Sequence, residues 1–395
     1  MRSWRVLTLG VLTLAGLLGV WGLDAGQTAV GQAQGAICLY FDQTGPGDLS
    51  FNDMALLGAQ RASEAFGLEL RTATAAGEAS YLPDLQTFAR SGECLVIIGV
   101  GFLLFDALPE AARQFPDQKF AFIDGPSFDL PNLLGVLFRE QEAGAPVGVV
   151  AALVALANGD SLIGAVAGAE IPPVWRYEAG YRFGAHWAVD WYNRHVGEGA
   201  SIEVRVPYTG RFDDPALGKT TAEALIREGA RNLLGIAGGT HLGMFDAVEE
   251  AARAEGREIG PPFAYGADAA QEYVKPGFIL ASGRKRVDVG AFEAVRRALS
   301  GEFGGDILLG LKEEGTGFST VQDVKTFIDL AVQAGYPLDG TPAEVLHKVI
   351  QARISVPAYV WVALDEFQSA LKAGEITLPE ADTPEQIAEV RERYP

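Results

Sequence analysis

The chain has 395 residues, of which 48% are apolar and 21% are charged, and its formal net charge is −20 at pH 7. That length and apolar fraction predict two globular domains, each with a proper core. The acidic excess argues against nucleic acid as a partner, because phosphate backbones bind clustered Lys and Arg. The same charge disfavours anionic membranes and polyphosphate substrates.

The N-terminus has the order of regions that is typical of a secretory signal peptide. Two arginines precede the apolar run Val6–Leu23, and a stretch of small and polar residues follows it. We expect cleavage between about Ala25 and Ala36, with residues 1–33 as the signal peptide, and a protein exported to the periplasm or the cell surface. An uncleaved membrane anchor is the alternative, since the run approaches the ~20 residues that a span needs. The run does not end in a cysteine, so a lipid anchor is not predicted.

After the signal, apolar runs alternate with amphipathic stretches in the manner of βαβ units, first over residues 36–138. The expected strands are Ile37–Phe41, Leu68–Thr72, Cys94–Val100, Lys119–Ile123 and Leu133–Phe138. The expected helices are Met54–Phe66, Leu82–Arg90 and Phe102–Phe115. These elements form a doubly wound lobe to which a later helix, Val287–Leu299, returns. The first lobe is therefore expected to comprise residues 36–138 and 287–305.

A second lobe of the same kind is expected over residues 139–286 and 306–378, followed by a polar tail, residues 379–395. Its expected strands are Ser161–Val166, Ser201–Pro207, Leu233–Ile236, Pro262–Ala267 and Phe278–Arg284. Its expected helices are Ala145–Ala157, Trp175–Asn193, Pro215–Glu228 and Met244–Glu255. Several chain crossings between two such lobes form a hinge, and strand ends from both lobes then face one cleft.

The two cysteines, Cys38 and Cys94, begin strands that lie side by side if strand one sits between strands two and three. Such a pair can form a disulfide in an exported protein, but we favour the alternative of two buried thiols. The four histidines are scattered, and no cysteine cluster accompanies them. The sequence therefore predicts neither a metal site nor a cofactor.

The most informative motif is Ser50–Asp53, with the sequence Ser-Phe-Asn-Asp. It follows the first strand and a Gly/Pro turn, and it opens an amphipathic helix. Open α/β sheets build ligand crevices where a strand end leads into a helix N-terminus. The motif therefore predicts a binding site.

Carboxylates close three apolar strands, at Asp42, Asp124 and Asp268. A single aspartate after a strand is most often a helix cap or a turn residue. Three at equivalent strand ends favour a ligand rich in hydroxyl and N–H donors, because an ionised carboxylate only accepts hydrogen bonds. Phosphates would be repelled from such a site.

Two aromatic residues, Phe51 and Phe212, follow strands of opposite lobes. Each by itself is most often a core residue. Facing each other across a cleft, they can sandwich a flat ring, which contributes about 1 kcal/mol beyond the area buried. Lys285 belongs to a basic run between a strand and a helix, which is either a solvated run or a cation reaching into the cleft.

Taken together, these residues resemble the basic membrane protein family of solute-binding proteins, whose best-known members are purine nucleoside receptors of ABC transporters. The resemblance runs from about Ile37 to Pro379 and rests on many short segments in order. These segments are Asp48–Asp53, Val100–Phe102, Phe122–Gly125, Leu137–Glu142, Ile171–Pro172, Glu178–Gly180, Phe212–Pro215, Ala237–Thr240, Gly266–Asp268 and Lys285–Asp288.

The resemblance implies a type I periplasmic-binding-protein fold, with two doubly wound parallel-sheet lobes joined by a hinge and a nucleoside between them. By motif position, Phe51 and Phe212 would stack on the purine. Asn52 would hydrogen-bond the edge of the base, and Asp124 would also meet the base side.

The remaining implied site residues surround the sugar and the strand ends. Asp268 and Lys285 would hold the ribose hydroxyls, and Gly239 would allow close approach of the backbone. Asp42 and Asp53 resemble members of the same shell.

One departure concerns Trp175, which stands where many relatives are expected to have a smaller or basic residue, so the pocket rim is expected to differ. The family also includes relatives thought to bind other flat ligands, so riboflavin is an alternative to a purine nucleoside such as guanosine or inosine. The expected partners are an ABC transporter permease and its ATPase, and the protein is expected to be a monomer. A receptor that signals without transport is a further interpretation.

An exported enzyme that acts on nucleosides is the alternative from another functional class. Such an enzyme would need a clustered acidic metal site, whereas Asp213–Asp214 is a lone pair followed by a proline. The sequence contains neither a nucleophile elbow nor a phosphate-binding loop. We therefore expect a binding protein rather than an enzyme.

Overall fold

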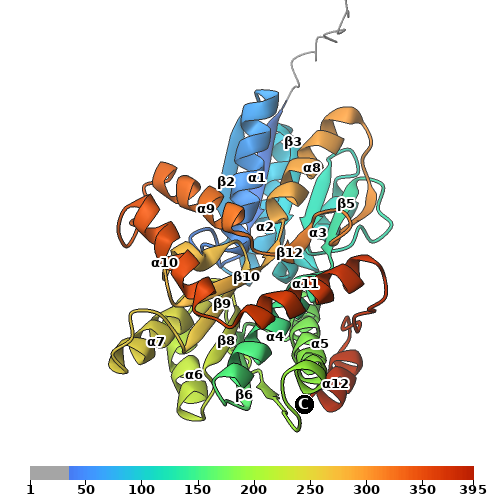
Figure 1. Ribbon diagram of the computed structural model, residues 1–395. Helices are drawn as coiled ribbons and strands as arrows, with labels where there is room; N and C mark the ends of the chain where they lie inside the picture. Colours follow the sequence, from blue (N-terminus) through green and yellow to red (C-terminus); the bar gives the residue numbers. More distant parts are fainter. Residues whose placement is uncertain (1–34) are drawn as a thin grey trace, which may run out of the picture. The chain divides into compact units, whose positions relative to one another are not determined.

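Two six-stranded sheets organise the protein, whose computed structural model describes residues 35–395 (Figure 1). The chain passes from the first sheet to the second after β5, returns after β10, and passes to the second again after β11. The chain therefore crosses three times between the two lobes, and these three segments form the hinge. The predicted signal peptide, residues 1–33, lies outside the described residues.

The first sheet has the strand order β11-β5-β4-β3-β1-β2, and all of its pairs are parallel. The strands are β1 (Ala36–Phe41), β2 (Leu70–Thr74), β3 (Cys94–Val100), β4 (Phe120–Ile123), β5 (Leu133–Phe138) and β11 (Gly305–Leu309). Helices α1 (Phe51–Phe66) and α8 (Val287–Ser300) pack together on one face, and α2 (Tyr81–Ser91) and α3 (Ala107–Gln114) cover the other. Helices on both faces explain why the central strands are continuously apolar.

The second sheet has the order β12-β10-β9-β8-β6-β7, with an antiparallel pair only between β10 and β12. The strands are β6 (Leu162–Ala167), β7 (Glu203–Arg205), β8 (Asn232–Ile236), β9 (Phe263–Asp268), β10 (Ile279–Lys285) and β12 (Thr316–Phe318). The helices of this lobe are α4 (Glu140–Ala157), α5 (Pro172–His195), α6 (Pro215–Arg227) and α7 (Thr240–Ala254). The predicted architecture of two doubly wound lobes is confirmed.

Four further helices follow β12: α9 (Val321–Gln333), α10 (Pro342–Ile354), α11 (Ala358–Lys372) and α12 (Pro384–Arg393). α11 packs on α4 and α12 packs on α5, so the C-terminal part of the chain covers the outer side of the second lobe (Figure 1). The expected polar tail, residues 379–395, is polar in composition and contains α12, which packs on α5. The helix there buries Ile387 and Val390, and Thr383 caps it in a capping box with Gln386.

Several predicted boundaries also differ from the structure. The return segment was expected to end at residue 305, but β11 extends it to Leu309 along β5. α5 begins at Pro172 rather than Trp175, because proline is favoured in the first turn of a helix. The predicted helix 102–115 is divided into a short 3₁₀ turn, Phe102–Leu104, and α3.

A disulfide joins Cys38 and Cys94. The two residues lie on the paired strands β1 and β3, with Cys38 opposite Ile97 and Cys94 opposite Ala36. The favoured expectation of two buried thiols is therefore wrong. The adjacency of the strands was predicted correctly, but the sequence did not establish that the two sulfur atoms are bonded.

α4 is the one helix among the described residues that is long and apolar enough to cross a membrane. It is instead buried between the second sheet and the helices α5 and α11. A helix that is apolar on all sides is typical of such a central position. α5 approaches it closely: a Cβ at Gly180 would lie 2.2 Å from the carbonyl oxygen of Gln141, and one at Gly184 would lie 2.0 Å from that of Ala145.

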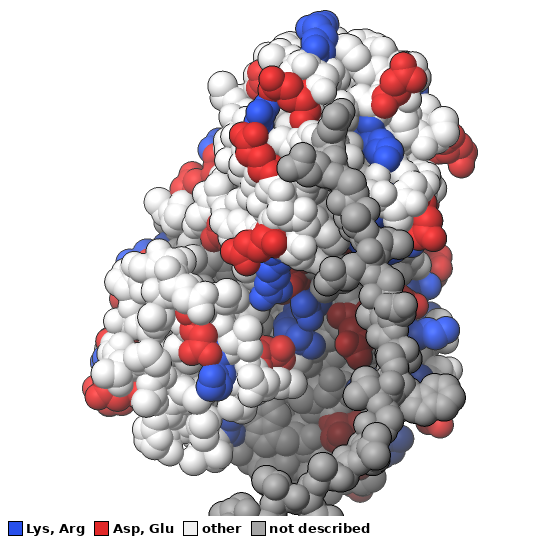
Figure 2. Space-filling model, turned by 90° about the horizontal axis from the view of Figure 1, so that it is seen from above, with Lys and Arg blue, Asp and Glu red and all other residues white. Residues whose placement is uncertain are grey.

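Acidic and basic side chains are mixed over the described part of the face shown in Figure 2. Many of the arginines and lysines of residues 35–395 form ion pairs, as Arg205 does with Glu203 and Glu228. The net charge of −20 thus comes from a surface on which acidic and basic side chains are interspersed. A surface of this kind keeps a protein soluble, and it does not create the positive electrostatic potential that attracts polyanions.

Candidate functional site

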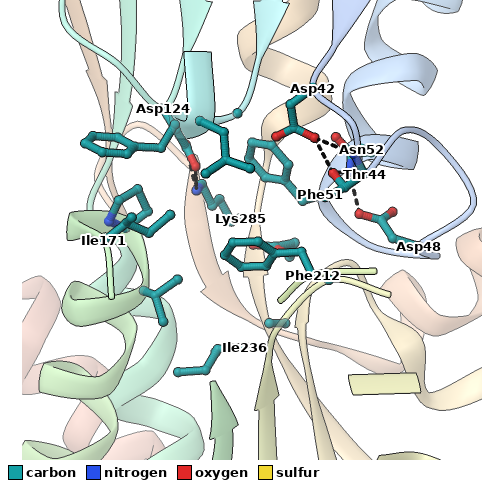
Figure 3. A pocket seen from close by; sticks show the side chains of 18 of the residues that line it. Asp42, Thr44, Asp48, Phe51, Asn52, Asp124, Ile171, Phe212, Ile236 and Lys285 are labelled. Atoms are coloured by element: carbon teal, nitrogen blue, oxygen red, sulfur yellow. Dashed lines mark hydrogen bonds and ion pairs between the residues drawn. The ribbon is translucent and has the colours of Figure 1, made fainter. Parts of the chain in front are cut away.

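The carboxyl ends of strands from both sheets meet at a cavity of about 610 Å³, part of which is open to solvent (Figure 3). Seven of the ten residues predicted for the site line this cavity, and they come from both lobes: Asp42, Phe51, Asn52, Asp124, Phe212, Asp268 and Lys285.

Asp268, the last residue of β9, is a buried carboxylate at the base of the cavity. Its backbone adopts a left-handed conformation with φ of 66°, which turns the chain at the strand end. The Ser50 hydroxyl of the first lobe lies 3.0 Å from Oδ2, and the Tyr177 hydroxyl lies 3.1 Å from Oδ1. Burial raises the pKa of Asp268 above its ordinary value, although these hydrogen bonds and the nearby Lys285 oppose that shift.

Lys285, at the end of β10, is a fully buried cation. Its Nζ lies 2.7 Å from Asp124 and 2.9 Å from Oε1 of Glu140, and it sits 4.9 Å from the ring centroid of Phe51 (Figure 3). Two carboxylates and an aromatic face compensate for the loss of water around the ammonium group. Burial raises the pKa of Asp124 above its ordinary value, and the charge of the neighbouring Lys285 opposes that rise.

A polar group from the first lobe occupies the opposite side of the cavity. Oδ1 of Asp42 accepts hydrogen bonds from the backbone N–H and the hydroxyl of Thr44. The Asn52 amide nitrogen donates to Thr44 Oγ1 at 3.1 Å. Oδ1 of Asn52 is buried and has no hydrogen-bond partner among the described residues. The cavity thus has an amide oxygen that is ready to accept a hydrogen bond.

The aromatic rings of Phe51 and Phe212 enter the cavity from opposite lobes (Figure 3). Phe51 is the first residue of α1, and Phe212 lies in the loop before α6. Gly168 makes room for the second ring, because a Cβ there would lie 2.1 Å from a ring carbon of Phe212. The fold thereby places two aromatic rings at one cavity, where a flat ligand could stack against them.

Three of the predicted site residues do not line the cavity. The Asp53 carboxylate accepts from the backbone N–H groups of Gly47 and Leu49, at 2.8 and 2.9 Å, and so shapes the loop before α1. Trp175 is buried on the other side of α5, against the C-terminal helix. Gly239 lies behind the Phe212 backbone, and the neighbouring Gly238 lines the cavity instead.

The cavity also includes residues that sequence reasoning missed: Thr44, Asp48, Gly101, Phe102, Leu103, Ile171, Pro173, Val174, Tyr177, Ile236, Gly238 and Ala267. Four of them belong to the start of α5 or precede it directly. The Pro172–Pro173 pair was a usable signal for this helix start.

His241 connects the second lobe to the loop before α1 through buried hydrogen bonds. Its Nδ1 accepts from the Ala237 N–H, so the proton is on Nε2, which donates to Gln271 Oε1 at 3.1 Å. The Gln271 amide nitrogen in turn donates to the carbonyl oxygen of Leu49 in the first lobe. Burial lowers the pKa of His241 to about 4.

We expect this histidine to make the folded state less stable in acid. Between pH 6.5 and 4 the unfolded chain takes up a proton at His241 that the folded chain does not, so stability falls by up to about 3 kcal/mol as the pH drops. The measurement is the free energy of urea unfolding at several pH values for the wild type and His241→Gln. The acid loss should be smaller in the variant, whereas a His347→Gln control on exposed α10 should follow the wild type. Identical pH profiles for all three proteins would contradict the prediction.

The chain belongs to the family of PnrA-like ABC transporter substrate-binding proteins, whose family model matches residues 38–334. An uncharacterised lipoprotein of Pyrococcus abyssi is 41% identical over 357 residues, which cover 90% of this chain and 86% of the relative. Basic membrane protein D of Borreliella burgdorferi is 27% identical over 286 residues, 71% of this chain and 77% of the relative. The predicted family membership is confirmed.

The fold is similar to that of solved solute-binding proteins. The crystal structure of an ABC transporter solute-binding protein from Aeropyrum pernix K1 has a TM-score of 0.84 and 39% identity, and the match covers 91% of this chain and 97% of that one. A sugar-binding protein of a Bacillus halodurans ABC transporter shares the fold at a TM-score of 0.52 and 13% identity, with coverage of 74% and 99%. The predicted type I periplasmic-binding-protein fold is confirmed. As a member of this family, the protein is a small-molecule binding component of an ABC transporter, with a permease and an ATPase as partners.

Proposed function

We propose that the cavity binds a nucleoside, with a purine nucleoside such as guanosine or inosine as the first candidate, and that the protein delivers it to its permease. The observation that carries this proposal is the pair Phe51 and Phe212, which enter one cavity from opposite lobes. A base between the two rings would contact both lobes at once. Binding would therefore favour the closed form, which a permease can recognise.

The polar groups around the rings suit the edge of a base. The unpartnered Oδ1 of Asn52 would accept from a ring or exocyclic N–H, and its hydrogen-bonded Nδ2 keeps the amide in that orientation. Asp124 provides a second acceptor on the opposite side of the cavity. Acceptors at both positions favour bases that carry N–H donors, as guanine and hypoxanthine do.

The charges of the cavity suit a sugar and exclude a phosphate. Asp268 would accept from ribose hydroxyls, and Lys285 would donate to the same group. Lys285 is the one cation among the described residues that line the cavity, and two carboxylates already hold it. A phosphate would meet several carboxylates without a free cation. The proposed ligand is therefore a nucleoside rather than a nucleotide.

We further infer that the protein is a carrier rather than an enzyme and that it acts outside the cytoplasm. Its carboxylates serve as acceptors or pair with Lys285, as a binding role requires. Relatives from three Pyrococcus species are named uncharacterised lipoproteins, a name used for proteins outside the cytoplasm.

Calorimetric titration of ligand-stripped, refolded protein tests the proposal. The titrants are guanosine, inosine, adenosine, cytidine, riboflavin and guanosine 5′-monophosphate. One-to-one binding of a purine nucleoside, with much weaker binding of the monophosphate, is the expected result. Binding of riboflavin alone, or of no compound in the series, would overturn the nucleoside assignment and leave the family assignment intact.

Two cavity variants should separate stacking from base recognition. Phe212→Ala should weaken every purine nucleoside alike, because loss of an aromatic surface under a base costs about 1–3 kcal/mol. Asn52→Ala should instead change the order of preference among guanosine, inosine and adenosine. Phe212→Tyr retains the ring and is the matched control. Full affinity of Phe212→Ala in the same titrations would show that the ring is only core packing.

A further inference from the structure

The first turns of α5 have two functional faces. One face belongs to the wall of the cavity, which includes Ile171, Pro173, Val174 and Tyr177. The hydroxyl of Tyr177 also contacts Asp268, the proposed acceptor for the sugar. The other face is covered by the C-terminal segment, residues 379–395, which includes α12 (Figure 1). A displacement of this helix start would therefore move the cavity wall.

Arg391 of α12 binds the face of α5 away from the cavity. Its guanidinium nitrogens lie 2.8 and 3.0 Å from the two oxygens of Glu178, a fully buried carboxylate, and 3.3 Å from Glu170. Arg182 and the Tyr208 hydroxyl complete the partners of Glu178, at 2.7 and 2.5 Å. A buried carboxylate is stable only when it is paired, so Arg391 and Glu178 hold α12 and α5 in one relative position.

Apolar packing strengthens the same contact. Trp175 of α5 is buried in a small cluster with Ala381, Ile387 and Val390 of the C-terminal segment. Its ring N–H donates to Glu170 at 2.5 Å. Trp175, expected at the rim of the pocket, thus serves as the surface on which α12 packs.

A chain of ion pairs leads from the C-terminal segment to the cavity. Asp382 lies 2.6 Å from Arg176, and Arg176 lies 2.5 Å from the fully buried Glu140. Glu140 in turn contacts Lys285, which contacts Asp124 at the cavity. Arg176 therefore helps to balance the two carboxylates that share one buried lysine.

We propose that residues 379–395 act as a strap that holds the α5 wall of the cavity in place and thereby sets the affinity for the ligand; its effect on affinity rests on the proposed function. The family model ends at residue 334, so the strap lies outside the residues that the model matches. Arg391 and Asp382 are positioning residues, because they act through Glu178 and Arg176 and do not reach the cavity.

The test compares Arg391→Gln with Arg393→Gln, which removes the same charge from an exposed position on the same helix. Titration with the best nucleoside should show about a tenfold loss of affinity for Arg391→Gln and less than about a twofold loss for the control. Asp382→Asn, at a half-exposed carboxylate, is a second variant with little risk of misfolding and should weaken binding by about threefold. Affinity is measured well below the unfolding temperature of each variant, so that loss of stability does not contribute.

Two further measurements separate positioning from a merely structural role. Exchange of the backbone amide hydrogens of residues 174–178 in the ligand-free protein should be faster in Arg391→Gln than in Arg393→Gln. In a double-mutant cycle, the affinity losses of Arg391→Gln and Tyr177→Phe should be non-additive, whereas those of Arg391→Gln and Asn52→Ala, across the cavity, should add.

Unchanged amide exchange in Arg391→Gln would show that the strap does not hold the cavity wall. Faster exchange with unchanged ligand affinity would show that the strap does not set the affinity. Either result overturns the proposal. If the wild type binds none of the nucleosides, the proposed function fails together with the effect on affinity. The exchange experiment, which needs no ligand, then decides by itself whether the strap holds the wall.

Discussion

Replacing Asp268 by asparagine is expected to weaken the binding of a purine ribonucleoside by roughly 10²- to 10⁴-fold. A hydrogen bond to a charged acceptor typically contributes about 1.5 to 3 kcal/mol, and two ribose hydroxyls would lose that acceptor. Asparagine has the same shape and tolerates the left-handed backbone of this residue, with φ of 66°. Burial already disfavours the charged form of Asp268, so the neutral amide should leave the fold intact. Calorimetric titration of both proteins measures the effect.

Deoxynucleosides provide the internal control for this prediction. The wild type should bind 2′-deoxy and 3′-deoxy purine nucleosides more weakly than the ribonucleoside, whereas Asp268→Asn should bind all three with similar low affinity. Asp268→Ala should also abolish binding, but alanine at a positive φ carries about 1–2 kcal/mol of backbone strain, so its stability is measured separately. An Asp268→Asn protein with full affinity would remove this residue from the ligand site.

Loss of the disulfide should lower the free energy of unfolding by about 4 kcal/mol. The bond closes a loop with a sequence separation of 56 residues, and cross-linking a loop of that length restricts the unfolded chain by about this amount. Both cysteines are buried on neighbouring central strands, so the native fold places the two sulfur atoms together without a further rearrangement. Urea unfolding of the oxidised wild type and of the double variant Cys38→Ala, Cys94→Ala measures the difference.

Reductant identifies how much of that loss belongs to the covalent bond. The wild type should become less stable when it is reduced, and the double variant should not respond. Alanine also removes two buried sulfur atoms, so a variant that is much less stable than the reduced wild type would assign part of the effect to packing. Equal stability of the oxidised and reduced wild type would contradict the prediction.

Most of the fold could be predicted because its signals are local. Continuous apolar strands such as Cys94–Val100 and amphipathic helices such as α1 alternate along the chain, and this order by itself implies doubly wound sheets. The C-terminal segment was expected to be only a polar, weakly helical tail, because few of its side chains are apolar, and its packing on α5 was not predicted. Its helix is stabilised by contacts with α5, and such tertiary contacts leave only a weak local pattern.

The site was predicted in part, for a similar reason. Strand-end residues such as Asp42, Asp124 and Asp268 could be assigned from their position, because the carboxyl ends of parallel strands meet at the same edge of a sheet. Asp53 and Trp175 could not be excluded in this way. Each lies beside a true cavity residue, and whether a side chain enters the cavity depends on where the helix starts and on what packs behind it.

The amino-acid sequence by itself determined the family and the two-lobed architecture, because these depend on the alternation of strands and helices and on the order of short motifs. Only the tertiary structure decided that Cys38 and Cys94 are bonded, that Glu140 shares the buried Lys285 with Asp124, and that the C-terminal segment packs against Trp175 of α5. Each of these features joins residues more than 50 positions apart, and their proximity results from packing that no local pattern specifies.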